Sequence, residues 1–369
     1  MSYNRTVARL RGVCILVVLL THYKFEFDLP FNGPIALWTN GYFGVTAFFV
    51  VSGYLITSNI IARYGELGAT RPLDFYARRA SRIVPPLALL LAVLSAFGGS
   101  ALRGLAIPPD QSLREMLWYA VTFRFNLYVQ FVPGHMVLAW AVLWSLAVEE
   151  VFYLGYPLLA VLLKDRRFFI AMLSCVIAVG LVDRMTGMPI EQREFSYFGC
   201  FDSIAFGALI ALLAPRYAGK FSRLSSSAIM ATGTAIAATT YLVMPFKENL
   251  VVGPELVSLG TAMILFASRS GPPAPRNSRM PDTLAFLGDC SYELYLYHFV
   301  LFILLRGAFG PIVSTIPDAL VFVAVLAITI LICAAIRILY AERLNGLLCR
   351  LLDAGDRPAG VVRERQAAS

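Results

Sequence analysis

The sequence carries little charge for its length. Of its 369 residues only 15% are Asp, Glu, Lys or Arg, whereas 58% are hydrophobic, and the mean hydropathy is +0.70. Soluble globular domains average about 25% charged residues. So few charges could not cover a water-facing surface, which excludes an ordinary soluble protein and predicts an all-α, polytopic membrane protein.

Cysteine pairs and cofactor motifs are missing as well. The six cysteines form no CxxC pair and no regular framework, and most lie in apolar runs, so we interpret them as small buried hydrophobic residues. The chain contains no Gly-rich phosphate loop, no dinucleotide fingerprint and no spacing typical of metal ligands. We therefore expect neither a bound metal nor a bound cofactor.

What the chain does have is ten runs that approach the ~20 apolar residues needed to cross a bilayer. They are 9–28, 41–62, 83–98, 140–163, 168–183, 200–214, 227–244, 250–267, 290–308 and 317–341. The segment 115–135 is aromatic but contains Arg124 and Asn126, so we predict an interfacial or re-entrant segment, with an extra span as the alternative. We expect residues 1–345 to form the membrane domain and 346–369 a disordered cytoplasmic tail.

The basic residues predict the orientation. The net charge of +8 is explained more simply by cytoplasmic loops than by a nucleic-acid partner. If the N-terminus is cytoplasmic, the inner segments contain 23 of the 31 Lys and Arg residues and the outer segments contain 8. The excess alternates loop by loop, and an even number of spans then places both termini in the cytoplasm. The first run ends without a cleavage motif, so we expect it to be retained.

This orientation gives each polar residue within a span a depth. His22 follows Arg11 by ~16 Å of helix, which places Arg11 at the cytoplasmic face and His22 near mid-membrane. The adjacent Glu149 and Glu150 lie at a similar depth, and their 100° offset allows at most one to point fully into a given site. We predict that one carboxylate orients or polarises His22 for acid–base work. The alternative is a structural role, in which these side chains bond neighbouring helices.

Three further polar positions are less decisive. His298, in SYELYLYHF, lies at a similar depth, but nearby tyrosines and Glu293 could satisfy it structurally. His135 lies in an outer segment, where it is either an ordinary loop residue or a contact for an extracytoplasmic substrate. Ser52, in FFVVSGYLI, is either a small packing residue or a nucleophile, although no Gly-x-Ser-x-Gly elbow surrounds it.

Arginine is concentrated before the third run. The segment RPLDFYARRASRIVPP contains four arginines, including Arg78, Arg79 and Arg82. Some of them could be simple cytoplasmic anchors, but guanidinium groups beside aromatic residues also suit a phosphate-rich ligand. Pro85 and Pro86 are expected to kink the helix or to delay its start, and so to open a cavity there.

Taken in order, these motifs resemble those of the acyltransferase-3 family of bacterial membrane O-acyltransferases. RLRGVCILVVLLTHY is similar to the family's first-helix pattern of an Arg-Gly pair followed by His. FFVVSGYLI resembles FFxxSGF, FYARRASRIVPPL resembles FxxRRxxRIxP, and WSLAVEEVFYLGYP resembles WSLxVEEQFY, with Val151 where Gln is more usual. FDSIAFGALIA and SYELYLYHF are similar to two later segments, so the resemblance covers about residues 5–340.

The resemblance implies about ten helices in a bacterial inner membrane, with acyl-coenzyme A as the donor on the cytoplasmic side. Some members carry an extra esterase-like domain, which we do not expect here. The residues implied in catalysis are His22, Arg11, Glu149 and Glu150. Those implied in donor binding are Arg78, Arg79, Arg82 and Ser52. Those that would contact the acceptor or serve structurally are His298, Tyr292, His135 and Asp202.

We therefore predict an O-acyltransferase that moves an acyl group, most simply acetyl, from acyl-coenzyme A to a hydroxyl. The acceptor would be a glycan, a lipid-linked sugar or a small hydroxylated molecule. His22 would either deprotonate the acceptor for direct attack or help the acyl group to cross to the outer side. The alternatives are a proton-coupled transporter or acyl-group translocator, which also carries buried His, Glu and Arg, and a sensor or structural membrane protein.

Overall fold

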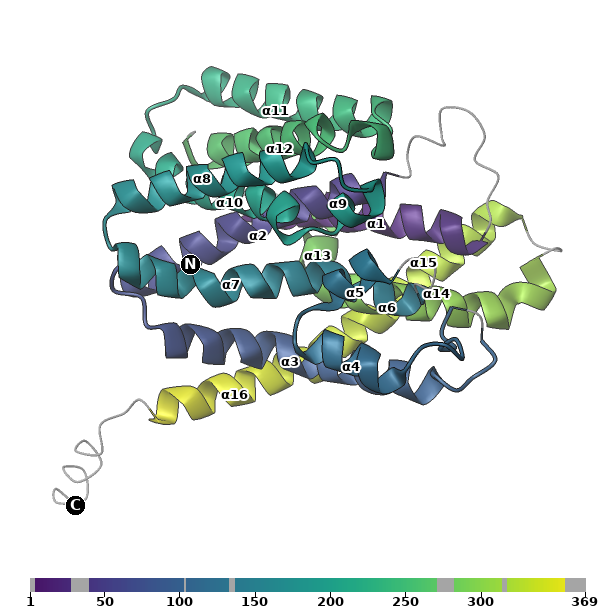
Figure 1. Cartoon of the computed structure of the whole chain (residues 1–369). Helices are drawn as coiled ribbons and strands as arrows, with labels where there is room; N and C mark the ends of the chain where they lie inside the picture. The colour runs from purple at the N-terminus through teal and green to yellow at the C-terminus, as the bar shows by residue number, and fades with distance from the viewer. Residues whose placement is uncertain are drawn as a thin grey trace, which may run out of the picture.

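The structure is a computed structural model that describes residues 4–27, 40–102, 104–132, 137–270, 282–313 and 317–355. Within these ranges the protein is all-helical, without a β-strand. Figure 1 shows the long helices lying side by side as one bundle, with α11 and α12 along one edge and α3 and α16 along the other. The predicted all-α class is confirmed.

Ten long helices coincide with the ten predicted apolar runs. They are α1 (Arg5–Phe27), α2 (Gly41–Tyr64), α3 (Pro72–Phe97), α7 (Leu143–Leu163), α8 (Arg166–Arg184), α10 (Tyr197–Leu213), α11 (Arg223–Val243), α12 (Val252–Ser270), α14 (Ser291–Val313) and α15 (Asp318–Ile336). Among the described residues, seven helical stretches are long and apolar enough to cross a membrane. The protein is thus a multi-pass membrane protein, while ten crossings and two cytoplasmic termini stay predictions.

The remaining elements are short. They are α4 (Leu113–Val121), α5 (Phe125–Phe131), α6 (Leu138–Ala141), α9 (Ile190–Glu194), α13 (Thr283–Asp289), α16 (Glu342–Gly355), the 3-10 turns Ala214–Tyr217 and Lys247–Asn249, and a π-helical turn at Arg337–Ala341. The described part of the aromatic segment, 115–132, falls on α4 and α5 and the residues beside them, and each helix is too short to cross a bilayer. Asn126 is fully buried there and donates a hydrogen bond to the Phe195 carbonyl at 3.2 Å, which ties α5 to the bundle.

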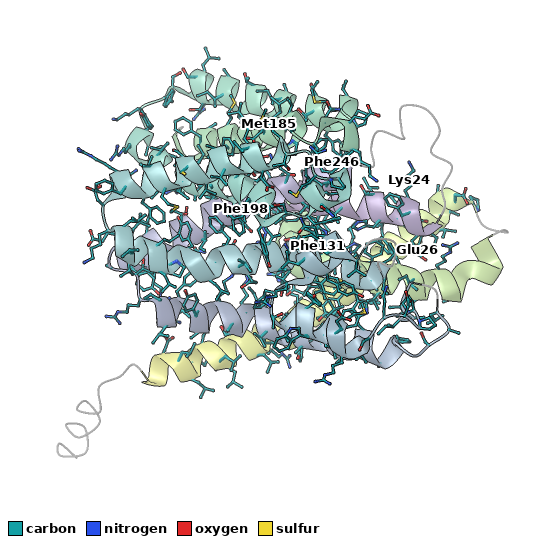
Figure 2. All side chains as sticks on the ribbon, viewed as in Figure 1. Lys24, Glu26, Phe131, Met185, Phe198 and Phe246 are labelled. Carbon is teal, nitrogen blue, oxygen red and sulfur yellow. The ribbon has the colours of Figure 1, made fainter. Side chains whose placement is uncertain are left out.

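Close helix contacts explain the small residues in the spans. A side-chain carbon added to Gly53 of α2 would collide with the Ile204 carbonyl of α10, and one added to Gly207 of α10 would collide with the Val50 carbonyl of α2. The two backbones therefore touch, as small residues in membrane helices allow. On the outside of the bundle, Phe131, Met185 and Phe198 are each more than half exposed (Figure 2), which leaves an apolar surface suited to lipid.

Helix α3 corrects one prediction. It begins at Pro72 and continues through Pro85 and Pro86, so the proline pair does not delay its start. A proline at the first helical position is favourable because its missing N–H would lack an intrahelical partner anyway. Around Pro85 and Pro86, tyrosine hydroxyl groups donate hydrogen bonds to carbonyl groups of α3. Tyr297 donates to the Pro86 carbonyl at 2.7 Å, and Tyr292 donates to the Ile83 carbonyl at 3.2 Å.

The predicted disordered tail is also wrong at its start. Residues 346–355 belong to α16, which packs against α3. Ser81 donates to the Asn345 amide oxygen at 2.9 Å, and Asp353 forms an ion pair with Arg78 at 2.5 Å. Polar side chains thus face α3 while Leu347 and Leu351 stay more than half exposed, a two-sided pattern typical of a helix lying at a membrane surface. The rest of the predicted tail, 356–369, lies outside the described residues.

Candidate active site

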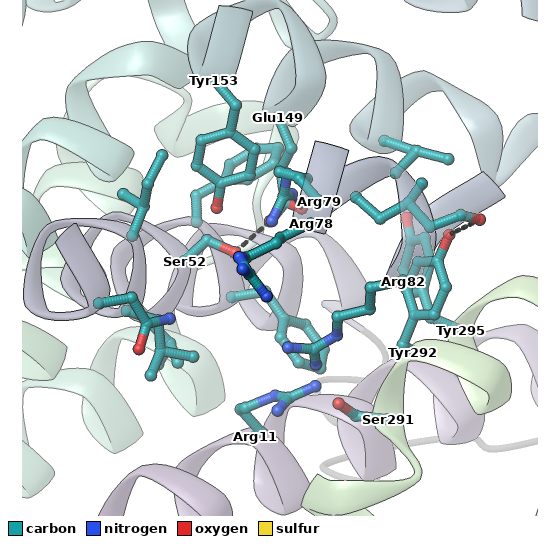
Figure 3. Close-up of a pocket in the computed structure, with 18 of the residues that line it drawn as sticks. Arg11, Ser52, Arg78, Arg79, Arg82, Glu149, Tyr153, Ser291, Tyr292 and Tyr295 are labelled. Carbon is teal, nitrogen blue, oxygen red and sulfur yellow. Dashed lines mark hydrogen bonds and ion pairs between the residues drawn. The ribbon is translucent and has the colours of Figure 1, made fainter. Parts of the chain in front are cut away.

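A cavity of about 680 Å³ lies between five helices. Its walls come from α2, α3, α7 and α14, where lining residues recur three or four positions apart on one face of each helix, and from Arg11 of α1. Figure 3 shows the guanidinium groups of Arg11, Arg78 and Arg82 converging from α1 and α3. Segments far apart in the sequence therefore build one site.

The cavity is strongly asymmetric along the bundle. At one end α2 and α3 contribute Arg63, Arg78 and Arg82, and this is the end that the charge count assigns to the cytoplasm. Further along the helices the walls become apolar, through Val45 and Phe49 of α2 among others. A polar head group with an apolar or uncharged extension matches this gradient.

Arg79 is fully engaged by the protein. Its guanidinium bonds both carboxylate oxygens of Glu150, with the shortest contact at 2.6 Å, and lies 3.6 Å from the centre of the Tyr153 ring. Tyr153 was missed in the sequence, although it lies one turn after Glu149. The role of Arg79 in donor binding stays a prediction, but this geometry makes the arginine first a partly buried counter-ion of Glu150.

The two glutamates diverge, as their 100° offset predicts. Glu149 lines the cavity, accepts a hydrogen bond from the Ser52 hydroxyl and lies 3.8 Å from the Arg79 guanidinium. Glu150 is 7% exposed, faces α3 and does not line the cavity. Ser52 therefore donates to a carboxylate within the site. Of the two carboxylates, Glu149 is the one that a ligand could reach.

The other arginines differ in how they are held. Arg78 is paired with Asp74 at 2.7 Å and with Asp353 at 2.5 Å. Arg11 and Arg82 line the cavity without a hydrogen bond or ion pair to any part of the chain that the structure describes. Two positive groups that face an open cavity and lack a carboxylate partner form a site suited to an anion.

His22 is bonded to a second histidine. Its Nδ1 lies 2.6 Å from Nε2 of His298, and the two ring planes differ by 6°. The expected carboxylate partner is therefore wrong: Glu149 is bonded to Ser52, and Glu150 to Arg79. Depth alone had placed these four residues in one layer, but their lateral neighbours depend on which helices touch.

The histidine pair lies just beyond the apolar end of the cavity. His22 does not line the cavity, whereas Tyr295, one turn before His298 on α14, does. The Tyr295 ring centre is 6.0 Å from that of His298, and the Tyr295 hydroxyl is 2.6 Å from the Ser145 hydroxyl. Tyr295 thus lines the cavity on one side and lies beside His298 on the other. Its position three residues before His298 was the available sequence signal for this role.

The structure describes two of the three remaining predicted residues, and one of these two lines the cavity. Asp202 is 1% exposed and forms an ion pair with Arg184 at 2.7 Å, away from the cavity. Tyr292 lines the cavity and donates to the α3 backbone. His135 lies outside the described residues. Among all residues that the structure describes, no group of three His, Cys, Asp or Glu side chains could hold a metal ion.

Known proteins match this chain over most of its length. A family model described as an acyltransferase domain, Acyl_transf_3, matches residues 7–338. The O-acetyltransferase OatA of Staphylococcus aureus strain NCTC 8325 is 24% identical over 329 residues, which cover 81% of this chain and 50% of the relative. A putative O-acetyltransferase of Staphylococcus aureus strain MSSA476 is 26% identical over 326 residues, with the same coverage.

The chain therefore spans about half the length of these curated relatives. No solved structure matches it. The family match includes the α1 helix that carries Arg11 and His22, the arginines of α3, the two glutamates of α7 and the histidine of α14. On this match the chain belongs to the acyltransferase-3 family.

Proposed function

We propose that the protein is a membrane-bound O-acyltransferase that moves an acyl group, most simply acetyl, from acyl-coenzyme A to a hydroxyl of a glycan or a related cell-surface or secreted molecule. One observation supports this above the others: a single cavity joins an arginine-lined end to an end beside the hydrogen-bonded pair of His22 and His298. The cavity would face the cytoplasm of a bacterial cell from the inner membrane.

The arginine-lined end suits the phosphate groups of the donor. Arg11 and Arg82 are available to an anion, and Arg78 could join them by exchanging Asp353 for a phosphate oxygen. Arginine recognises phosphate through several parallel N–H donors. The pantetheine arm of coenzyme A is long and uncharged, so it would extend along the more apolar part of the cavity toward Tyr295.

The chemistry would take place near Tyr295 and His22. The acceptor oxygen attacks the thioester carbon, an oxygen–carbon bond forms, the carbon–sulfur bond breaks, and coenzyme A leaves as a thiol. His22 takes the hydroxyl proton as general base and returns it to the leaving sulfur. His22 is partly exposed and does not line the donor cavity, so the acceptor would approach its ring from outside that cavity. A relay across the Tyr295 layer is the second route.

The test compares membranes containing the wild-type protein with membranes containing His22→Ala. Labelled acetyl-coenzyme A is supplied, and both labelled product and released thiol are measured. We expect His22→Ala to lower transfer about 10²- to 10⁴-fold, the usual contribution of general acid–base catalysis. Thr234→Ala, on the exposed face of α11, serves as the control.

Wild-type transfer by His22→Ala would overturn the assignment of the base. If donor is never consumed but proton flux follows an added solute, the protein is a transporter instead. The acceptor itself would be identified by comparing the glycans and lipids of a deletion strain by mass spectrometry, where one species should lose the mass of one acetyl group.

A further inference from the structure

We infer that His298 is a positioning residue: it fixes the tautomer of His22 so that Nε2 of His22 is the unprotonated atom available to the acceptor. This inference rests on the proposed function, because it assigns the base of that reaction to one atom.

The backbone determines the proton of His298. Nδ1 of His298 lies 2.9 Å from the Leu294 carbonyl oxygen and 2.9 Å from the Tyr295 carbonyl oxygen. A carbonyl only accepts hydrogen bonds, so Nδ1 must carry the hydrogen. The opposite tautomer would direct a nitrogen lone pair at two oxygen lone pairs. Because His298 is completely buried, it is held as a neutral ring, and its Nε2 therefore carries a lone pair.

The proton of His22 follows from that of His298. Nδ1 of His22 is 2.6 Å from Nε2 of His298, and a bond of that length needs one hydrogen between the two nitrogens. Since His298 supplies the acceptor, His22 supplies the N–H from Nδ1. A neutral imidazole has one N–H, which leaves Nε2 of His22 unprotonated.

Ring packing holds this arrangement in place. The His22 ring centre is 4.2 Å from that of Phe299, one residue beyond His298 on α14. The His298 ring is bounded in turn by Phe302, with ring centres 5.7 Å apart and planes at 79°. Neither imidazole can rotate without losing an aromatic contact, so the tautomer and the direction of Nε2 are set together.

The same bond would assist the reaction. When Nε2 of His22 takes the acceptor proton, the ring becomes positively charged and its Nδ1–H remains directed at the His298 lone pair. A hydrogen bond from a charged donor is roughly twice as strong as one from a neutral donor. His298 would thus stabilise the protonated His22, the role first expected of a glutamate, without contacting substrate.

The direct test measures the tautomers by nitrogen NMR. The full chain, with ring-¹⁵N histidine, is studied in lipid nanodiscs; the chain has three histidines, and His135→Gln removes the third signal. We expect a protonated Nδ1 and an unprotonated Nε2 for both His22 and His298, with a scalar coupling across the bond between them. A protonated Nε2 on His22, or an unchanged His22 tautomer in His298→Asn, would overturn the inference.

Two variants separate positioning from structure. His298→Gln keeps a carbonyl oxygen near the place of Nε2 and can still accept from His22. His298→Asn keeps an N–H near the place of Nδ1 but offers His22 nothing. We expect acyl transfer to fall less than about tenfold in His298→Gln and about 100-fold in His298→Asn, with the KM for acetyl-coenzyme A unchanged in both. Equal losses in the two variants would contradict the positioning role.

Failure of this inference differs from failure of the proposed function. If His22→Ala transfers acetyl like the wild type, the proposed base is wrong, whatever the tautomers are. If His22→Ala is inactive but the nitrogen spectra show a protonated Nε2 on His22, the proposed function stands and the role of His298 is wrong.

Discussion

Two arginines of this bundle, Arg184 and Arg82, differ in their surroundings: Arg184 is buried, whereas Arg82 is exposed at the cavity. Arg184 of α8 is 2% exposed, donates to the Gly199 carbonyl and pairs with Asp202 at 2.7 Å and Glu255 at 3.0 Å. Arg82, in contrast, faces a cavity and forms no ion pair with the described residues. A buried arginine whose neighbours already neutralise it stabilises the fold, whereas one that faces open space awaits a ligand.

The same distinction separates neighbouring arginines within the site. Arg79 is bonded to Glu150 and stacked on Tyr153, so it resembles Arg184 more than Arg82. Arg78 is intermediate, since one of its two partners, Asp353, is largely exposed and could be exchanged. The family motif places these arginines together in the sequence, but their surroundings assign them different tasks.

The largest effect is expected at the cluster of Arg184, Asp202 and Glu255, whose charges are already paired. Arg184→Leu leaves the buried Asp202 and the partly buried Glu255 without their cation, and breaking a buried pair costs about 3–5 kcal/mol. We expect a clearly lower thermal unfolding midpoint in detergent, measured by intrinsic fluorescence. The control is Arg184→Leu combined with Asp202→Leu, which should recover part of the loss. An unchanged midpoint in the single variant would contradict a structural role for this cluster.

A smaller effect is expected at Arg82, which lines the cavity and has no ion-pair partner among the described residues. Arg82→Gln removes a charged hydrogen-bond donor to the donor phosphates, worth about 1.5 kcal/mol at the lower end for such bonds, so the KM for acetyl-coenzyme A should rise roughly tenfold. The unfolding midpoint should not change, because no described ion pair is lost. Arg223→Gln, an exposed arginine at the start of α11, is the matched control and should leave KM unaltered.

The smallest effect is expected at Arg78, whose partner Asp353 is largely exposed. Asp353→Asn removes the exposed partner of Arg78, and such surface pairs contribute about 0.2–1 kcal/mol. If the donor displaces Asp353, the variant should bind acetyl-coenzyme A up to about fivefold more tightly in an equilibrium binding assay. Asp318→Asn, an exposed carboxylate at the start of α15, is the control. Weaker binding by Asp353→Asn would mean that α16 assists donor binding.

Much of the fold could be predicted because membrane helices are encoded locally. Each predicted apolar run lies on a long helix, since ~20 consecutive apolar residues have no other stable form in lipid. The predicted helix boundaries were wrong where a helix extends beyond its apolar run. Helix α3 begins at Pro72, in a polar segment before the apolar run at 83–98. The helical part of α16 was missed because its stability comes from contacts with α3, 264 residues away along the chain at Ser81 and Asn345.

The candidate site was predictable in its members but not in its bonds. His22, Glu149 and Arg82 were identified from their depth and their family motifs. The partner of His22 was not, because the charge count assigns depth along the membrane normal but not the neighbours of a helix around its axis. Tyr295 and Tyr153 were missed for the same reason, since a tyrosine in an aromatic span is ordinary until its hydroxyl and ring are seen in the site.

The sequence by itself determined the membrane class, the long apolar helices and the family, because hydropathy and short motifs are properties of consecutive residues. Only the tertiary structure decided that His22 pairs with His298, that Arg79 is neutralised and that Arg82 is not. These outcomes depend on which faces of α1, α3, α7 and α14 meet, and packing between distant segments determines that.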